Sequence, residues 1–212
     1  MLAQLGGRPV LEWVLRRVNN SCGVDEVILA TSTDRRNDAL IQVAEDCHVR
    51  SFRGEEVDVL QRFVGAARAT EADLVVRVCA DNPFVDPGEI DRLIAFFLGC
   101  GCDYAFNHQD RLGCNYADGF GAEVLGVPLL EQIARSASAP AHREHVTQFL
   151  WDHADAYRIE AVPVPAALAY PNLRFDIDTA EDLARLSALV TAGIDVSTPA
   201  RRIVELSLEG KL

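Results

Sequence analysis

Residues 74–83 read Leu-Val-Val-Arg-Val-Cys-Ala-Asp-Asn-Pro. The apolar run from Leu74 to Val78 is typical of a buried strand, and Pro83 comes too soon after Asp81 for that strand to continue. We therefore expect a turn at Asp81 and a new helix that begins near Gly88. Ligands bind at the carboxyl ends of strands in open α/β sheets, so this turn is a candidate site. A lone aspartate here also suits an ordinary turn.

A second acidic stretch lies near the end of the chain, where residues 174–183 read Arg-Phe-Asp-Ile-Asp-Thr-Ala-Glu-Asp-Leu. Alternation on an extended segment places Asp176 and Asp178 on one face. Thr179 suits a helix N-cap, with Asp182 in the capping-box position. One carboxylate from each acidic stretch can share a hard cation, because Mg²⁺ is commonly held by one or two carboxylates plus substrate phosphates.

The rest of the chain alternates between strand and helix patterns. We expect strands over 24–31, 49–52, 74–78, 102–107, 122–127 and 157–164, and helices over 9–19, 34–47, 57–70, 88–99, 128–138, 143–153 and 179–192. This rhythm predicts a single α/β domain over residues 1–212, with a parallel sheet and helices on both faces. Only the polar stretch 108–119 interrupts it, and loops of that length often carry function.

Composition narrows the class of protein. The 212 residues carry a net charge of −12 and no basic run, which argues against nucleic-acid binding. No apolar run is long enough for a membrane span. The six cysteines form no C-x-x-C pair and no signal peptide is seen, so we expect free thiols in a cytoplasmic protein. His142 and His145 lack the further ligand that a zinc site needs.

Several short motifs, taken in order, resemble the cytidylyltransferases that make CMP-activated acidic sugars. The closest likeness is to the subfamily named after spore coat polysaccharide biosynthesis, which is similar to acylneuraminate and KDO cytidylyltransferases. The motifs are Leu-Gly-Gly-Arg-Pro-Val-Leu-Glu at 5–12, Phe-Arg-Gly at 52–54 with Asp-Val-Leu at 58–60, Val-Arg at 76–77 leading to Asp-Asn-Pro at 81–83, Asp-Gly at 118–119 with Glu-Val at 123–124, His-Arg-Glu-His-Val-Thr at 142–147, and Arg174 with Asp-Thr at 178–179.

The resemblance implies a doubly wound, mostly parallel α/β domain of the nucleotide-diphospho-sugar transferase type, which is Rossmann-like. Such enzymes join CTP to a sugar oxygen and release pyrophosphate, here for polysaccharide biosynthesis. The family's Mg²⁺ ligands match Asp81 and Asp178, and Ala80 stands where the family often has Gly. Arg77 is expected to act in catalysis by stabilising phosphate charge, although a structural ion pair is an equally ordinary use of this arginine.

The substrate-binding residues expected on the same grounds are Arg174, Asp118, Glu123 and Asn107. The polar stretch 115–123 is expected to border the sugar rather than the nucleotide, because it is the long interruption in the strand–helix rhythm. We also expect a homodimer that pairs through residues 128–164, where related enzymes carry an insertion.

One departure from the family lies at the start of the chain. The family begins with a central strand and an Arg-x-x-Ser-x-Arg-x-Pro-Gly-Lys loop that wraps the triphosphate, whereas this sequence starts at Met1, where that loop should end. We therefore expect the first strand to be missing and its neighbours to have unpaired edges. We also expect residues 1–212 to bind CTP weakly and to show little turnover.

Two other functions remain open from the sequence. A non-catalytic relative would bind a sugar, a nucleotide or a partner without turnover. A nucleotide-sugar glycosyltransferase would carry an Asp-x-Asp metal motif after the central strand. Asp176-Ile177-Asp178 has that spacing, but it lies close to the end of the chain, where it suits the cytidylyltransferase pattern better.

Overall fold

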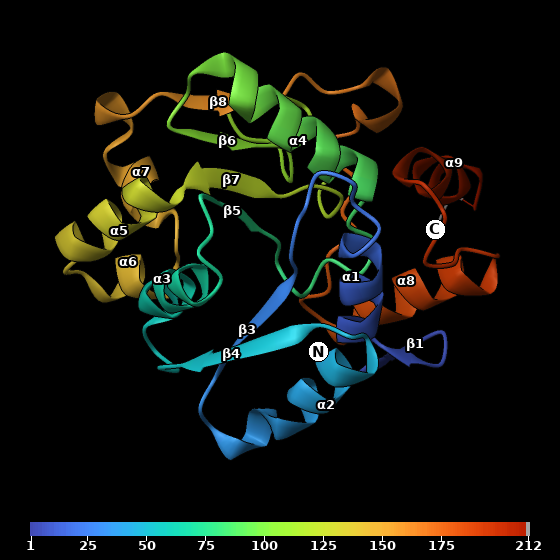
Figure 1. The fold of residues 1–212 in the computed structure, drawn as a ribbon. Helices are drawn as coiled ribbons and strands as arrows, with labels where there is room; N and C mark the ends of the chain where they lie inside the picture. Colours follow the sequence, from blue (N-terminus) through green and yellow to red (C-terminus); the bar gives the residue numbers. More distant parts are fainter. Residues whose placement is uncertain (211–212) are drawn as a thin grey trace.

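The structure, a computed structural model, describes residues 1–210. Its strands form three sheets (Figure 1). The largest has the order β5-β7-β6-β8, the second pairs β3 with β4, and the third is the hairpin β1-β2. The bounds are β1 (Gln4–Leu5), β2 (Arg8–Pro9), β3 (Ile28–Ser32), β4 (Arg50–Gly54), β5 (Leu74–Arg77), β6 (Tyr104–Phe106), β7 (Glu123–Gly126) and β8 (Ile159–Ala161).

The α/β class expected from the sequence is confirmed, but the sheets are mixed rather than mostly parallel. β3 and β4 run parallel, as do β6 and β8, whereas β7 lies antiparallel between β5 and β6. Parallel neighbours need a crossover connection that is usually helical. The segment between β6 and β7 contains no helix, so the chain returns beside β6 in the opposite direction.

The helices are α1 (Val10–Val18), α2 (Asp38–Asp46), α3 (Val59–Ala69), α4 (Pro87–Cys100), α5 (Val127–Ser136), α6 (Pro140–Glu144), α7 (Gln148–Asp152), α8 (Ala180–Thr191) and α9 (Ala200–Gly210). Short 3₁₀ turns cover Arg35–Asn37, Ala154–Ala156 and Ala166–Leu168. The single helix expected over 143–153 is wrong, because the chain is extended at His145 between α6 and α7. There Val146 is buried and the Thr147 hydroxyl donates to Glu123, so tertiary contacts override helix propensity.

The largest sheet is covered on both faces, and β7 shows how. Leu125 packs with α3, α5 and α7 in one apolar cluster, while Val124 packs with α1 and α4 in another. Successive residues of a strand point to opposite faces, so these two neighbours serve different cores. Figure 1 shows α3, α5, α6 and α7 gathered on one side of the strands and α1, α8 and α9 on the other.

Two strands, β3 and β5, have the unpaired edges that were expected from the sequence. Within residues 1–210, β3 is hydrogen-bonded only to β4, and β5 only to β7. Apolar side chains on the two strands, including Leu29, Val75 and Val76, are only half-buried. The two sheets therefore share no hydrogen-bond ladder within the described residues.

The cysteines depart from the expectation of free thiols. Cys100 and Cys102 form a disulfide at the end of α4, while Cys22, Cys47, Cys79 and Cys114 are free. Gly101 between the paired residues adopts a left-handed conformation with φ of 62°, which reverses the chain and brings the two Cα atoms to 5.3 Å. Among the described residues, no helix is long and apolar enough to cross a membrane.

Candidate active site

A cavity of about 390 Å³ opens beside the carboxyl end of β5. Arg77, Cys79 and Asp81 all line it. β5 ends at Arg77, and the turn closed by the hydrogen bond from Asn82 N to Cys79 O at 3.2 Å carries Asp81 to the same cavity. The strand and turn singled out in the sequence therefore supply one wall of the cavity.

The floor of this cavity is a buried ion pair. The antiparallel register places Arg77 directly opposite Glu123, and the guanidinium donates to that carboxylate. Glu123 also accepts hydrogen bonds from the Tyr104 hydroxyl and from Thr147 Oγ1, the latter at 2.9 Å. Burial opposes the charge of Glu123, but Arg77 and these donors hold its pKa below the ordinary value. The charge on Arg77 is thus balanced inside the fold.

A group of aspartates forms the next part of the wall, and we call Asp81, Asp118 and Asp176 the carboxylate edge. The backbone brings them together: Ile177 N donates to Asp81 O at 3.0 Å, and Phe175 N donates to Asp118 O at 3.0 Å. Asp81 Oδ1 is buried and has no hydrogen-bond partner. Burial and the neighbouring acids raise the pKa of Asp81, and the same causes raise the pKa of Asp118 to about 6.

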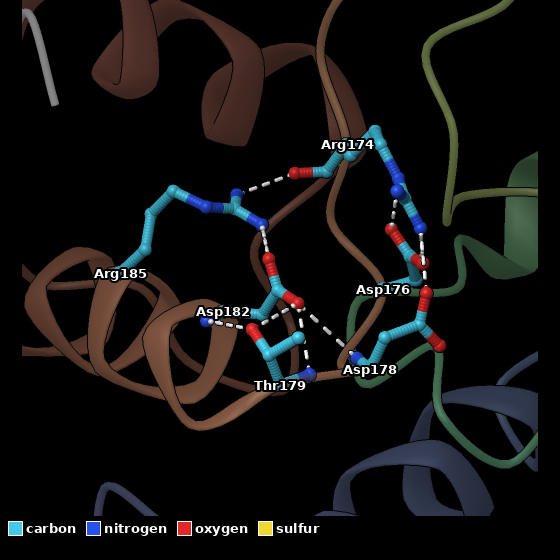
Figure 2. Close-up of polar contacts among 6 residues, drawn as sticks. All are labelled: Arg174, Asp176, Asp178, Thr179, Asp182 and Arg185. Carbon is cyan, nitrogen blue, oxygen red and sulfur yellow. Dashed lines mark hydrogen bonds and ion pairs between the residues drawn. The ribbon is translucent and has the colours of Figure 1, made fainter.

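Arg174 partly neutralises this edge. Its guanidinium donates to both oxygens of Asp176 and reaches Asp178 Oδ2 at 2.8 Å (Figure 2). The Asp176 side chain is 11% exposed, whereas that of Asp178 is 58% exposed and lies outside the cavity lining. The capping box formed by Thr179 and Asp182 begins α8 directly after these acids and so fixes their position.

The structure brings most of the predicted site residues together. Five of them line the cavity: Asp81, Arg77, Asp118, Glu123 and Arg174. Asp178 does not line it, but it accepts a hydrogen bond from Arg174, which does. Figure 2 also shows Arg185 holding Asp182 and the Arg174 carbonyl, which supports this segment from outside.

Asn107 is the exception, and the expectation that it contacts substrate is corrected. The side chain is fully buried, its Nδ2 donates to Glu89 O at 2.8 Å, and its Oδ1 accepts from Ala122 N at 2.9 Å. Both ends of the amide are therefore occupied by backbone. Gly121 packs so closely here that an added Cβ would meet Asn107 O at 2.1 Å. Asn107 anchors the start of β7 rather than a ligand.

Sequence reasoning missed a second group of residues that line the cavity, which we call the aromatic end. It consists of His108, Gln109, Arg111, His145, Gln148 and Trp151. These residues come from the polar loop after β6 and from the region of α7. The loop and the motif over 142–147 were both noticed in the sequence, but no spacing rule linked them, because they meet only through the fold.

The donor chemistry of the carboxylate edge fits a hard divalent cation. Within residues 1–210, no three or more His, Cys, Asp or Glu side chains are already arranged as a metal cage. However, Asp81 presents an unpartnered buried oxygen, and the acids around it disfavour one another's charges. Oxygen ligands that repel one another are the kind that Mg²⁺ binds together with substrate phosphates.

Comparison with known proteins places this site in a family. The sequence matches the family described as Cytidylyltransferase over residues 1–197. It is 33% identical over 195 residues to the spore coat polysaccharide biosynthesis protein SpsF of Bacillus subtilis (strain 168), a match that covers 89% of this chain and 78% of that protein. It is 32% identical over 98 residues to a 3-deoxy-manno-octulosonate cytidylyltransferase of Trichlorobacter lovleyi, covering 46% of this chain and 38% of that one.

The fold is likewise similar to a solved structure of a cytidylyltransferase from Leptospira borgpetersenii serovar Hardjo-bovis (strain JB197). The TM-score is 0.91 at 23% identity, and the match covers 99% of this chain and 87% of the other. This likeness establishes a nucleotidyltransferase-like, Rossmann-like fold. The match over residues 1–197 establishes more, since it spans both the β5 turn and the Arg174–Asp178 segment: the chain belongs to the cytidylyltransferase family.

Proposed function

We propose that this protein transfers CMP from CTP to an acidic sugar, with release of pyrophosphate, in the synthesis of a surface polysaccharide. The observation that carries the proposal is one cavity lined by two chemically unlike groups of residues. The carboxylate edge suits a metal-bound triphosphate, and the aromatic end suits a polyhydroxylated ring with polar and stacking groups. The names of the relatives, a spore coat polysaccharide biosynthesis protein and a 3-deoxy-manno-octulosonate cytidylyltransferase, support the same proposal.

In this reaction a sugar hydroxyl oxygen attacks the α-phosphorus of CTP. A new oxygen–phosphorus bond forms, the bond from the α-phosphorus to the bridging oxygen breaks, and pyrophosphate leaves with the electron pair while the hydroxyl loses its proton. Mg²⁺, when bound, would offset the charge on the phosphate oxygens. Asp81 and Asp178 are the residues proposed to hold it, and Asp176 and Asp118 lie beside them.

The other charged groups of the cavity have supporting roles in this proposal. Arg174 balances Asp176 and Asp178, so it must shift its contacts when a cation enters. The charge of Arg77 is balanced by Glu123. In an acidic protein of net charge −12, these two arginines keep the acids that they pair with from adding to the repulsion that a triphosphate would otherwise meet.

CTP binding measured by calorimetry, with Mg²⁺ and with EDTA, tests the proposal without depending on turnover. We expect binding that requires Mg²⁺, and its loss in Asp81→Asn. The exposed Asp155 lies outside the cavity lining and offers a matched control, Asp155→Asn, which should bind like wild type. Pyrophosphate release with a panel of eight- and nine-carbon sugar acids then tests the transfer step. CTP binding that is absent, or equal in Mg²⁺ and EDTA, would refute the proposal.

The second candidate is a non-catalytic relative that binds a sugar or nucleotide. One observation favours it: Arg174 already forms ion pairs with Asp176 and Asp178. The negative charge of Asp176, on the carboxylate edge, is therefore balanced by the protein itself. Such a protein would bind a sugar or CTP equally well in Mg²⁺ and EDTA and would release no pyrophosphate. The calorimetric comparison therefore separates the two functions.

We also propose that the protein is a homodimer. Residues 128–164 add α5, α6, α7 and β8 to the sheet, and Figure 1 shows the three helices together at one side of the molecule. Light scattering over a wide concentration range should give twice the 23.2 kDa mass of one chain. A monomer mass at every concentration would contradict the proposal.

A further inference from the structure

Arg111 is a cation of the cavity whose charge the fold does not balance. Its guanidinium lies over the Trp151 ring, with Cζ 4.6 Å from the ring centroid, and both residues line the cavity. The other cavity arginines pair with acids, Arg77 with Glu123 and Arg174 with Asp176 and Asp178. No carboxylate among residues 1–210 pairs with Arg111, so its donors are open to a ligand.

His108 lies in the same wall as Arg111 and bears on which charge is open there. The His108 side chain is 11% exposed, and within residues 1–210 its buried Nδ1 has no hydrogen-bond partner. Buried polar atoms are normally bonded, and His108 lies in the cavity wall beside Arg111. Burial lowers the pKa of His108, and the nearby Arg77 and Arg111 lower it further against the pull of Glu123. The imidazole is therefore neutral at pH 7, which leaves Arg111 as the open positive charge of the aromatic end.

We infer that Arg111 binds the carboxylate of the sugar substrate and so selects an acidic sugar over a neutral one. A planar guanidinium matches a carboxylate with two parallel hydrogen bonds, and stacking on Trp151 holds that plane in place before the ligand arrives. The carboxylate edge, being acidic, repels the sugar acid and directs it to this end. This inference rests on the proposed function for its substrate.

The test compares each sugar acid with its own methyl ester, which removes the charge and keeps the ring. Affinities of the eight- and nine-carbon acids and their esters are measured by calorimetry for wild type, Arg111→Gln and Arg111→Lys. In wild type the best acid should bind at least about tenfold more tightly than its ester. Arg111→Gln should lose about tenfold or more for the acid while ester binding is unchanged, and Arg111→Lys should lie between, because a lysine keeps the charge without the planar fork.

Two controls separate this result from misfolding and from a phosphate role. Arg202→Gln, on the exposed surface of α9, should bind all ligands like wild type, and melting curves should show that Arg111→Gln is folded. Binding of CTP with Mg²⁺ should be unchanged in Arg111→Gln; a parallel loss there would assign Arg111 to phosphate and overturn the inference. Equal affinity of wild type for acid and ester, or no binding of either, would also overturn it.

The same measurements distinguish failure of the proposed function from failure of the role inferred for Arg111. If acid is preferred through Arg111 but CTP binding with Mg²⁺ is absent, the sugar-acid subsite stands and the cytidylyl transfer fails. If CTP binding requires Mg²⁺ but acid and ester bind alike, the nucleotide half of the proposed function stands and the role of Arg111 fails.

Discussion

Substitution of Glu123 by glutamine is the perturbation whose outcome follows most directly from the structure. The Glu123 side chain is 3% exposed, and Arg77 beside it is 23% exposed. Glutamine keeps the shape of the side chain and an oxygen for Tyr104 and Thr147. However, it removes the negative charge that balances Arg77, so a buried guanidinium is left without its counter-ion.

Breaking a buried ion pair by removing one partner typically costs about 3–5 kcal/mol. Arg77 is partly solvated, which places the expected loss for Glu123→Gln near the lower end, about 3 kcal/mol. Domains of this kind are stable by only about 5–15 kcal/mol, so the variant should lose a large share of its stability. Replacing both partners, as in Arg77→Leu with Glu123→Leu, should cost less than the single change, because no uncompensated charge is then buried.

The stabilising effect of Glu123 should depend on pH, and its pKa gives the direction. The folded pKa of Glu123 is depressed, so its contribution is present above the unfolded value of about 4.3 and is lost as the pH falls through the folded pKa. The free energy of unfolding from urea titrations should therefore differ between wild type and Glu123→Gln at pH 7, and the difference should shrink below about pH 4. A loss under about 1 kcal/mol at pH 7 would refute the reasoning.

The matched control is Glu131→Gln. Glu131 pairs with Arg68 at 2.7 Å and with Arg135 at 3.8 Å, and both arginines are largely exposed. Surface pairs contribute about 0–1 kcal/mol, so this variant should melt close to wild type. A control loss as large as that of Glu123→Gln would show that burial is not the cause.

Three further outcomes are expected. Asp81→Asn should raise the melting temperature in EDTA, because burial and nearby acids disfavour the Asp81 charge. The same substitution should abolish any gain in melting temperature on adding Mg²⁺. An unchanged Mg²⁺ response would count against Asp81 as a ligand. Thr179→Ala should cost about 1 kcal/mol by urea titration, since it removes the N-cap of α8, and no measurable loss would mean that the cap is not needed. Gly121→Ala should cost about 3 kcal/mol or more, because its Cβ would meet the Asn107 backbone oxygen at 2.1 Å, and wild-type stability would show that this segment can shift.

The sequence predicted local features well where one residue type decides the backbone. The strand before Asp81, the start of α4 near Gly88 and the capping box at Thr179 all follow from proline, glycine and capping chemistry, and all are present. The antiparallel placement of β7 did not follow, because strand direction depends on which edge is free when the chain returns. The break between α6 and α7 was missed because Thr147 is held by Glu123, a contact 24 residues distant.

The site shows the same division between local pattern and tertiary contact. Asp81 was predicted from the turn after a strand, and Asp118 and Arg174 from the resemblance to the family; the structure places all three in one cavity. Asn107 was wrongly assigned to substrate because its polarity is equally useful to backbone groups in the core. Arg111 and Trp151 were missed, since nothing in the sequence indicates that a loop arginine stacks on a tryptophan 40 positions later.

Arg77 and Asp81 lie in one segment, but the fold uses them differently: one charge stabilises the structure, and the other is left open to a ligand. Both residues line the cavity, Arg77 from the end of β5 and Asp81 from the turn that follows it. The register then gives Arg77 a buried partner, Glu123, while Asp81 Oδ1 is left without any. A balanced charge stabilises the fold and has little left to offer a ligand, whereas an unbalanced one destabilises the empty site and is relieved when a cation binds. On this reasoning, we expect the ion pair with Glu123 to be the main role of Arg77, and we propose that the substrate complex needs the charge of Asp81.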